Sequence, residues 1–266
     1  GRRAASLRGL VARLRRERLP AADVQVFLEA MKDQHLLGSP QVCTSVISSL
    51  GGKALWQEAV TLMVDMWRQP ESPLDTAAFN ATARACAKAA RWEQVVSLLR
   101  GIRSFELLPD LITYNTSISA CEKGRQWEYA LSLLDEAVSA GLSADVVTCS
   151  TAISACSKGG AWAGALALLA GMPDRQLAPD VIVYNATISA CGQGQQWERS
   201  LHLLAHARRQ QLRPDVISYN AVISACGKGQ EWALALHQLG TMMLAELRPS
   251  VTTYNTAVTA CERGGQ

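Results

Sequence analysis

The side chains that most often carry enzymatic or metal chemistry are few in this sequence and do not form a site. His202 and His206 are spaced to share one helix face, but no carboxylate completes a metal site with them. The run Gly192-Gln193-Gly194 follows no strand and precedes no Gly-Lys-Ser/Thr, so it is not a phosphate-binding loop. We therefore expect no enzyme, no cofactor and no small-molecule substrate.

The eight cysteines also favour a structural role over chemistry. Cys43 and Cys149 stand at one apolar position of a repeated unit, and no C-x-x-C pair is present to hold zinc. We interpret all eight as small buried fillers whose free thiols indicate a reducing compartment. The other six share a second apolar position of the unit: Cys86, Cys121, Cys156, Cys191, Cys226 and Cys261.

A period of 35 residues organises the sequence, and a repeat of that length predicts a solenoid built from one supersecondary unit. A Tyr-Asn pair marks the unit at Tyr114-Asn115, Tyr184-Asn185, Tyr219-Asn220 and Tyr254-Asn255. A tryptophan marks it at Trp92, Trp127, Trp162, Trp197 and Trp232. The step from Trp56 to Trp92 is one residue longer, and we expect the extra residue in the turn over 71–75.

Each unit has the pattern of two amphipathic helices. In the unit 111–145, Tyr114, Ile118 and Cys121 form a first apolar stripe, which a break at 124–126 ends. A second stripe ends near Gly141, a residue suited to a left-handed helix terminus. This second stripe comprises Trp127, Ala130, Leu131, Leu134 and Val138, and we expect the tryptophan position to be buried.

One hairpin cannot bury both of its faces, so the hairpins must stack into an all-α solenoid. Small residues such as Ala120 and Ala130 provide close contacts between neighbours. Asp110, Asp145, Asp180 and Asp215 each precede a predicted helix, where a carboxylate caps free backbone amides.

The periodicity also predicts the domain organisation. We expect six full units at 40–75, 76–110, 111–145, 146–180, 181–215 and 216–250, then a first helix only at 251–266, and we interpret the sequence as part of a longer protein. Residues 1–39 form a degenerate Arg-rich hairpin or cap, with a balance of eight basic to four acidic side chains. Its first 18 residues hold seven arginines, which also resembles an organelle transit peptide. No apolar run is long enough to cross a membrane.

Charge points to a partner only through its placement, because the net charge of +3 is small. Basic residues recur at one register of the first helix, with Gln193 as the exception: Lys88, Lys123, Lys158, Lys228 and Arg263. Ile112, Asn115 and Ser119 share a helix face with Lys123.

That mixed face is hard to explain by helix stability, since Asn and Ser are poor helix formers. An apolar wedge, a hydrogen-bonding tip and a cation in every unit suit single-stranded nucleic acid, whose bases stack and whose phosphates meet lysine. The alternative is that Asn115 and its equivalents link adjacent hairpins by hydrogen bonds. Ser119 and its equivalents have a similar alternative, a bond back to a helical carbonyl.

The motif V-x-x-Y-N-x-x-I-S-A-C-x-K-G-x-x-W, with Pro-Asp at 109–110, 179–180 and 214–215, resembles the pentatricopeptide repeat (PPR) family over nearly the whole chain. The resemblance implies a right-handed superhelical solenoid of about seven helix hairpins, the last incomplete. It also implies that each unit reads one base of single-stranded RNA through its fifth and last residues. Tetratricopeptide repeats, with a 34-residue period, fit poorly.

By the family pattern, Asn with Asp favours U, Thr or Ser with Asp favours G, and Asn with Ser favours C over U. The implied core is 5′-GUUGU(C/U)-3′, and Asn255 begins a further pyrimidine-reading unit. The reading pairs are Thr44/Asp75, Asn80/Asp110, Asn115/Asp145, Ser150/Asp180, Asn185/Asp215 and Asn220/Ser250. The resemblance assigns the sandwiching of bases to Ile112, Val147, Ile182 and Ile217.

The resemblance further implies action in organellar RNA processing, stability or translation, in a mitochondrion or chloroplast, with protein partners of a processing complex. We expect the repeated cations to contact phosphates. The competing hypothesis is a protein-binding helical scaffold without RNA readout.

Overall fold

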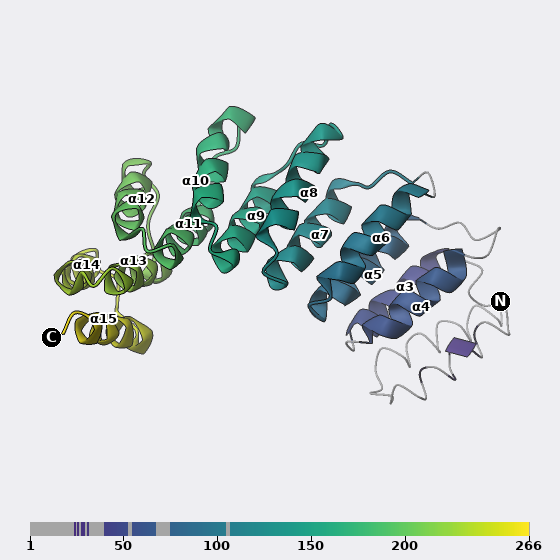
Figure 1. The fold of residues 1–266 in the computed structure, drawn as a ribbon, viewed down its shortest axis with the longest axis horizontal. Helices are drawn as coiled ribbons and strands as arrows, with labels where there is room; N and C mark the ends of the chain where they lie inside the picture. The colour runs from purple at the N-terminus through teal and green to yellow at the C-terminus, as the bar shows by residue number, and fades with distance from the viewer. Residues whose placement is uncertain are drawn as a thin grey trace. The chain divides into compact units, whose positions relative to one another are not determined.

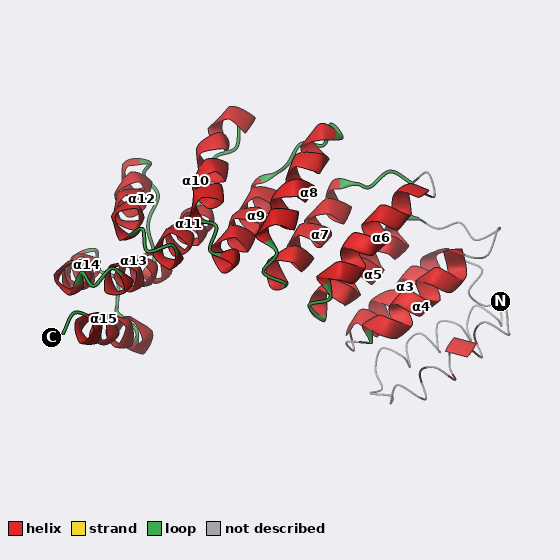
Figure 2. Ribbon diagram, viewed as in Figure 1, coloured by secondary structure: helices red, strands yellow, loops and turns green. Residues whose placement is uncertain are grey.

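The computed structural model describes residues 40–52, 55–67, 75–104 and 107–265, together with five helical positions between 24 and 31. All regular structure in these residues is helical, as expected for the all-α class (Figure 2). The chain divides into two compact units, 1–124 and 125–266, so the expected repeat 111–145 belongs to both. Most of the expected cap at 1–39 and the turn at 71–74 lie outside the described residues, although Val24, Leu28 and Met31 are buried.

From residue 40 onward, the described part of the first unit contains five α-helices, arranged as hairpins that follow one another along the chain (Figure 1). We call the first helix of each hairpin an A helix and the second a B helix. Successive A helices pack on one another, and each B helix packs against the A helices before and after it. The A helices are α3 (Pro40–Gly52), α5 (Thr76–Lys88) and α7 (Leu111–Lys123), and the B helices are α4 (Trp56–Trp67) and α6 (Trp92–Ser104).

The second unit repeats this arrangement. Its A helices are α9 (Val146–Gly159), α11 (Val181–Gln193), α13 (Val216–Lys228) and α15 (Val251–Arg263). Its B helices are α8 (Trp127–Ser139), α10 (Trp162–Gly171), α12 (Trp197–Arg209) and α14 (Trp232–Leu244), and a short 3-10 turn, η1 (Pro173–Arg175), follows α10. Within this unit the A helices form a continuous row, whereas the B helices contact A helices far more than one another.

Small side chains let the A helices approach closely. A hypothetical Cβ on Gly192 would lie 2.9 Å from the Cβ of Ala225 on the next A helix, and one on Gly227 would lie 2.8 Å from that of Ala260. Alanine occupies this contact position in six A helices and is buried in every one: Ala85, Ala120, Ala155, Ala190, Ala225 and Ala260. The predicted role of small residues in stacking is therefore confirmed.

Each B helix begins with a tryptophan, and from α6 onward this tryptophan packs on the glycine at the end of the next A helix. A Cβ on Gly194 would lie 2.1 Å from Cδ1 of Trp162, and the Arg199 guanidinium lies 4.4 Å from the centroid of the Trp162 ring. Trp162 is only partly buried, so the prediction of a buried tryptophan is wrong. The ring contacts the end of the next A helix at Gly194 and the Arg199 guanidinium instead of being fully buried in the core.

The B-helix stripe also differs from the prediction at one end. Val138 is 43% exposed, and Leu133, which the stripe omitted, is buried with Ala130 and Leu134. The buried residues of α8, which packs on the following A helix, are at positions 130, 133, 134 and 137, so the buried face of this helix does not include Val138.

The cysteines are buried as predicted, apart from Cys261, which is partly exposed. Burial raises the pKa of Cys121 to about 12 and that of Cys86 and Cys156 to about 11. These thiols therefore stay protonated at neutral pH and make poor nucleophiles or metal ligands. Among the described residues, no three His, Cys, Asp or Glu side chains lie together in a way that would hold a metal ion. In the same part of the chain, every helix is too short or too polar to cross a membrane.

We predict that Gly194→Ala destabilises the protein by about 1–3 kcal/mol, because its Cβ would overlap the Trp162 ring. Gly240→Ala is the matched control, since a Cβ there meets nothing within 4 Å and lies within α14. We expect the control to be neutral or to stabilise by up to about 1 kcal/mol. Urea denaturation followed by circular dichroism measures both, and equal stabilities would contradict the packing described.

Candidate nucleic-acid interface

Within the second unit, a row of exposed branched aliphatic side chains follows the A helices, and α7 of the first unit carries such a residue at the same position. Ile112, Val147, Ile182 and Ile217 are 56%, 63%, 66% and 64% exposed, although each stands in the first turn of a well-packed helix. A single exposed aliphatic residue needs no explanation, but a row at one register does. These are the four positions to which base sandwiching was assigned.

One turn further along each of these helices stands the predicted base-reading residue. Asn115, Ser150, Asn185 and Asn220 are partly exposed, so an amide or hydroxyl lies beside each aliphatic side chain. In contrast, Asn80 is only 6% exposed, and the residue three positions before it is Ala77 instead of a large aliphatic residue. The candidate surface is therefore best developed from α7 onward in sequence.

The most complete pair is Asn185 and Asp215. Asn185 Nδ2 donates to Asp215 Oδ1 over 3.1 Å, and the same carboxylate oxygen accepts the backbone N–H of Ser218 at 2.9 Å. The Ser218 hydroxyl lies 2.5 Å from Asn185 Oδ1 and 3.0 Å from Asp215 Oδ1. The carboxylate therefore caps α13 and holds the amide of the preceding A helix at the same time.

A second pair in the first unit repeats this geometry. Asn80 Nδ2 donates to Asp110 Oδ1 over 3.3 Å, while Asp110 accepts the backbone N–H of Thr113 at 2.7 Å. The Oδ1 atom of Asn80 is buried and has no hydrogen-bond partner among the described residues. The Oδ1 atom of Asn220 is in the same situation.

Hydrogen bonds keep these carboxylates ionised. Burial by itself would raise the pKa of Asp110, but bonds from the Thr113 hydroxyl, the Thr113 backbone and the Asn80 amide together lower it below its usual value. The pKa of Asp215 is lowered in the same way by Ser218 and Asn185 against the opposing effect of burial. An ionised carboxylate only accepts hydrogen bonds, so Asn80 and Asn185 must turn their NH₂ groups toward it.

The capping role of the aspartates is confirmed. Asp75, Asp145 and Asp180 accept from the backbone N–H of the third helical residue at 2.8, 2.7 and 2.9 Å, and Ser250 does so at 3.2 Å. Both the capping role and the role in linking hairpins, which the sequence left as alternatives to RNA contact, are therefore real features of the reading positions. Neither excludes contact with RNA, because the second amide proton and Oδ1 have further bonding capacity.

The other predicted reading residues also lie at the surface. Thr44 is partly exposed on α3, and Asn255 is exposed on α15. Asn115 and Asp145 belong to different compact units, so their pairing stays a prediction.

Sequence reasoning overlooked the third helical residue. Thr113, Thr148, Ser218 and Thr253 are buried hydroxyl residues that bond to the capping side chain, and Ser218 also contacts Asn185. A hydroxyl residue three positions after the cap, repeated with the 35-residue period, is the signal that reveals them; Ala78 and Val183 are the exceptions.

The repeated cations lie at the other end of the A helices. Lys88, Lys123, Lys158, Lys228 and Arg263 are exposed in the last turn of their helices. A cation there also interacts favourably with the helix dipole, so helix stability explains part of the pattern. They share the A helices with the aliphatic and amide positions.

Comparisons with known proteins agree with this arrangement. Residues 109–158 match the model of the PPR repeat family, residues 202–263 that of the pentatricopeptide repeat domain and residues 147–177 that of the PPR repeat. A search of curated proteins gave no match.

Solved structures give the same fold. The crystal structure of the pentatricopeptide repeat protein PPR10 from maize is 27% identical, with a TM-score of 0.73, and the match covers 97% of this chain and 39% of that one. PPR10 in complex with an 18-nt psaJ RNA element is 24% identical, with a TM-score of 0.67, over 97% of this chain and 41% of that one. The PPR domain of Arabidopsis thaliana protein-only RNase P 1 in complex with tRNA is 10% identical, with a TM-score of 0.58, over 70% of this chain and 98% of that one.

We predict that Asp215→Asn lowers stability at neutral pH by up to about 1 kcal/mol, because Asn still caps a helix but carries no charge. The pKa of Asp215 is lowered in the folded protein, so its stabilisation is present above the unfolded value of about 3.8 and is lost as pH falls through the folded value. The difference between wild type and variant should therefore vanish in strong acid.

Thermal unfolding followed from pH 7 to pH 2 measures this difference. Asp174→Asn is the control, because Asp174 is exposed and caps no α-helix. A gap between Asp215→Asn and wild type that persists unchanged at the lowest pH would contradict the assigned charge state.

Proposed function

Because the chain belongs to the pentatricopeptide repeat family, we propose that it binds single-stranded RNA along its A helices and reads one base per repeat. The observation that carries the proposal is the recurring pair of an exposed aliphatic side chain and an amide or hydroxyl one turn later, which Asp215 holds in place at Asn185. The crystal structure of a similar fold in complex with an RNA element supports the choice of ligand. The chain spans 39% of the length of the maize protein, so the proposal concerns this segment.

The aliphatic row accounts for affinity. The face of a base is apolar, and placing it against Ile182 or Ile217 removes exposed hydrocarbon from water on both sides. Because successive A helices present the same position, bases held between neighbouring side chains are spaced one per repeat. This contribution to the free energy of binding does not depend on base identity.

The amide and its carboxylate account for selectivity. Asp215 fixes the orientation of the Asn185 amide, so the edge left for a base has one N–H donor and one carbonyl acceptor in a defined order. Uracil offers the complementary N–H and carbonyl groups on its pairing edge. This arrangement supports U at the Asn/Asp units, namely Asn80/Asp110, Asn115/Asp145 and Asn185/Asp215.

Units with other pairs are expected to read differently. At Asn220 the partner is Ser250, whose hydroxyl can donate or accept, so the amide is free to turn and to accommodate either C or U. Ser150 with Asp180 and Thr44 with Asp75 are assigned to G by the family pattern. The proposed core is 5′-GUUGU(C/U)-3′, with the first letter from Thr44/Asp75.

The repeated cations supply an attraction to phosphate that is independent of sequence. We further propose an organellar role in RNA processing, stability or translation, which rests on the family resemblance. Protein partners of a processing complex belong to the same proposal.

We predict that Asn185→Thr shifts the preference at the fifth base from U toward G. Base-edge hydrogen bonds discriminate by roughly 1–3 kcal/mol in duplex recognition, so the preference should change by about tenfold or more. Fluorescence anisotropy with GUUGUC and GUUGGC RNAs measures this change on the whole chain.

Two controls accompany that measurement. Asn185→Ala should reduce selectivity at the fifth base without creating a preference for G, and the fourth base, assigned to Ser150/Asp180, should be read as before in both variants. Equal affinity of the wild-type chain for GUUGUC and for a scrambled strand would instead favour the protein-binding scaffold.

We predict that Lys228→Ala weakens binding to all RNAs alike and reduces the slope of log affinity against log salt by about 0.7, because one phosphate contact is lost. The reverse change, Gln193→Lys, introduces the cation that the neighbouring repeats carry at Lys158 and Lys228 and should steepen the slope by a similar amount. Affinities measured over a salt series test both variants. A sequence-dependent effect of Lys228→Ala would refute the phosphate role.

A further inference from the structure

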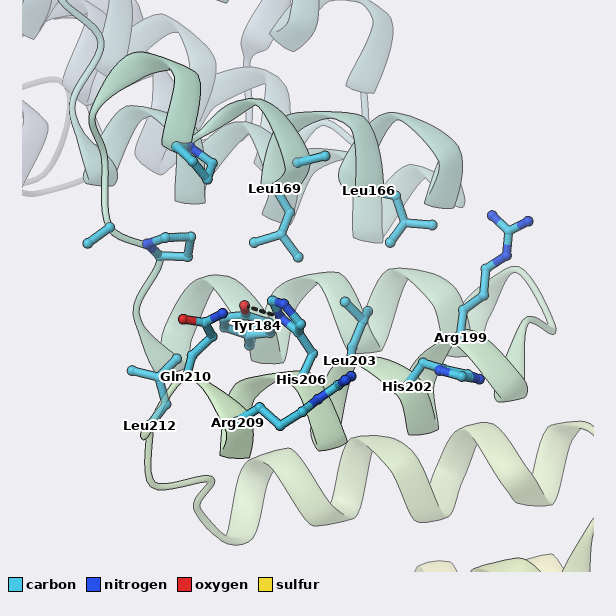
Figure 3. A pocket seen from close by; sticks show the side chains of 14 residues that line it. Leu166, Leu169, Tyr184, Arg199, His202, Leu203, His206, Arg209, Gln210 and Leu212 are labelled. Atoms are coloured by element: carbon cyan, nitrogen blue, oxygen red, sulfur yellow. Dashed lines mark hydrogen bonds between the residues drawn. The ribbon is translucent and has the colours of Figure 1, made fainter.

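A groove lies between the B helices α10 and α12, and no base-reading residue is among the side chains that line it (Figure 3). Its volume is about 760 Å³, within the range of ligand-binding cavities. Its wall from the intervening A helix is Tyr184, which is buried, whereas Ile182 and Asn185 do not line it. The groove is therefore a second surface, formed by the other row of helices.

The lining of the groove combines leucines with cations. Leu166 and Leu169 face it from α10, and Leu203 faces it from α12 (Figure 3). No Asp or Glu is among the lining residues, whereas four basic or imidazole side chains are: Arg199, His202, His206 and Arg209. Each of these four side chains is exposed, so each is accessible to a partner in solution.

These four residues form one stripe along α12, since their spacing of three, four and three positions keeps them on one helix face. The Tyr184 hydroxyl fixes His206 within the stripe through a 2.7 Å contact with Nδ1. Arg199 is fixed at the other end by stacking on Trp162. Two of the four are therefore held in place before any partner binds.

The stripe is specific to this repeat, although the repeat itself is strongly periodic. In three other B helices the equivalent positions hold no basic residue: Gly164, Ala167, Gly171 and Asp174; Tyr129, Ser132, Glu136 and Ser139; and Gln94, Ser97, Gly101 and Ser104. In α14 they are Leu234, His237, Thr241 and Leu244. Duplication of an ancestral unit therefore does not explain the four residues of α12.

The composition of α10 explains why the groove is open. This helix has ten residues, ends at Gly171 and gives way to η1 at Pro173. Small side chains such as Ala170 form its edge, where α12 carries long ones. The shortened helix and the cationic stripe thus occur in adjacent repeats and line the same space.

We propose that this groove binds an amphipathic helix of a partner protein that carries leucines on one face and Asp or Glu beside them. A helix laid along α12 meets the cationic stripe at matching intervals of three and four residues, while its leucines enter between Leu166, Leu169 and Leu203. The leucines that line the groove favour this occupant over RNA, because they offer apolar area to leucine side chains but no hydrogen-bonding group to a base edge or a phosphate.

A peptide library tests the proposal with the complete 266-residue chain. Random peptides of about 16 residues, long enough to follow α12 at about 1.5 Å per residue, are selected against the wild-type chain. The counter-selection uses Ala170→Trp, which fills the groove from an exposed position. Enriched peptides should combine acidic residues with leucines at helical spacing, and no enrichment, or enrichment of basic peptides, would overturn the proposal.

Variants then locate the site. The double variant His202→Glu/Arg209→Glu should bind an enriched peptide about tenfold more weakly or worse, with affinity for GUUGUC RNA unchanged. Arg248→Glu, an exposed charge reversal outside the groove, should bind the peptide like wild type. Equal peptide binding by the double variant, or displacement of the peptide by RNA in the wild type, would refute a separate protein-binding groove.

Discussion

The hydrogen bond between an Asn of one repeat and the capping aspartate of the next connects helix capping, hairpin stacking and the proposed base reading. Oδ1 of Asp215 accepts a free backbone N–H at the start of α13 and also holds the Asn185 amide of α11. The same hydrogen bonds lower the pKa of Asp215, so the carboxylate stays ionised. Stacking and the proposed base reading thus depend on the same atoms. A shift of one hairpin against the next would remove the cap and turn the amide at once, so helix stability itself maintains the register of the proposed reading surface.

Local rules explain which features the sequence predicted. Helix caps, the left-handed Gly141 and the buried alanines depend on neighbours within one unit or on a strict repeat, and the structure confirms them. Val138 and Trp162 were predicted wrongly because the facing of a B helix depends on the next A helix, which the periodicity of one helix does not reveal. The Ser218–Asn185 contact joins residues 33 positions apart, so only the geometry of stacking could show it.

The two rows of helices differ in how much variation they tolerate. A helices approach one another through Gly and Ala, where even a methyl group would collide, as at Gly192 against Ala225. B helices contact mainly A helices, and their outward faces carry few such constraints. Departures from the repeat pattern on an A helix, such as Gln193 or Ser250, are therefore single substitutions at accessible positions, whereas α10 and α12 differ from their equivalents along a whole face.

This asymmetry separates the two proposed activities physically. A strand of RNA along the A helices would contact every repeat, so its affinity accumulates over many weak and similar contacts. Of the B helices compared, only α12 carries the cationic stripe that lines the groove. A partner bound there would therefore lie at a fixed position relative to the bases of the bound RNA. A protein held at Arg199 and Arg209 would lie next to the repeats 146–180 and 181–215, whose proposed letters are G and U. Base order would then determine not only where the chain binds on a transcript but which nucleotides lie nearest to the bound partner.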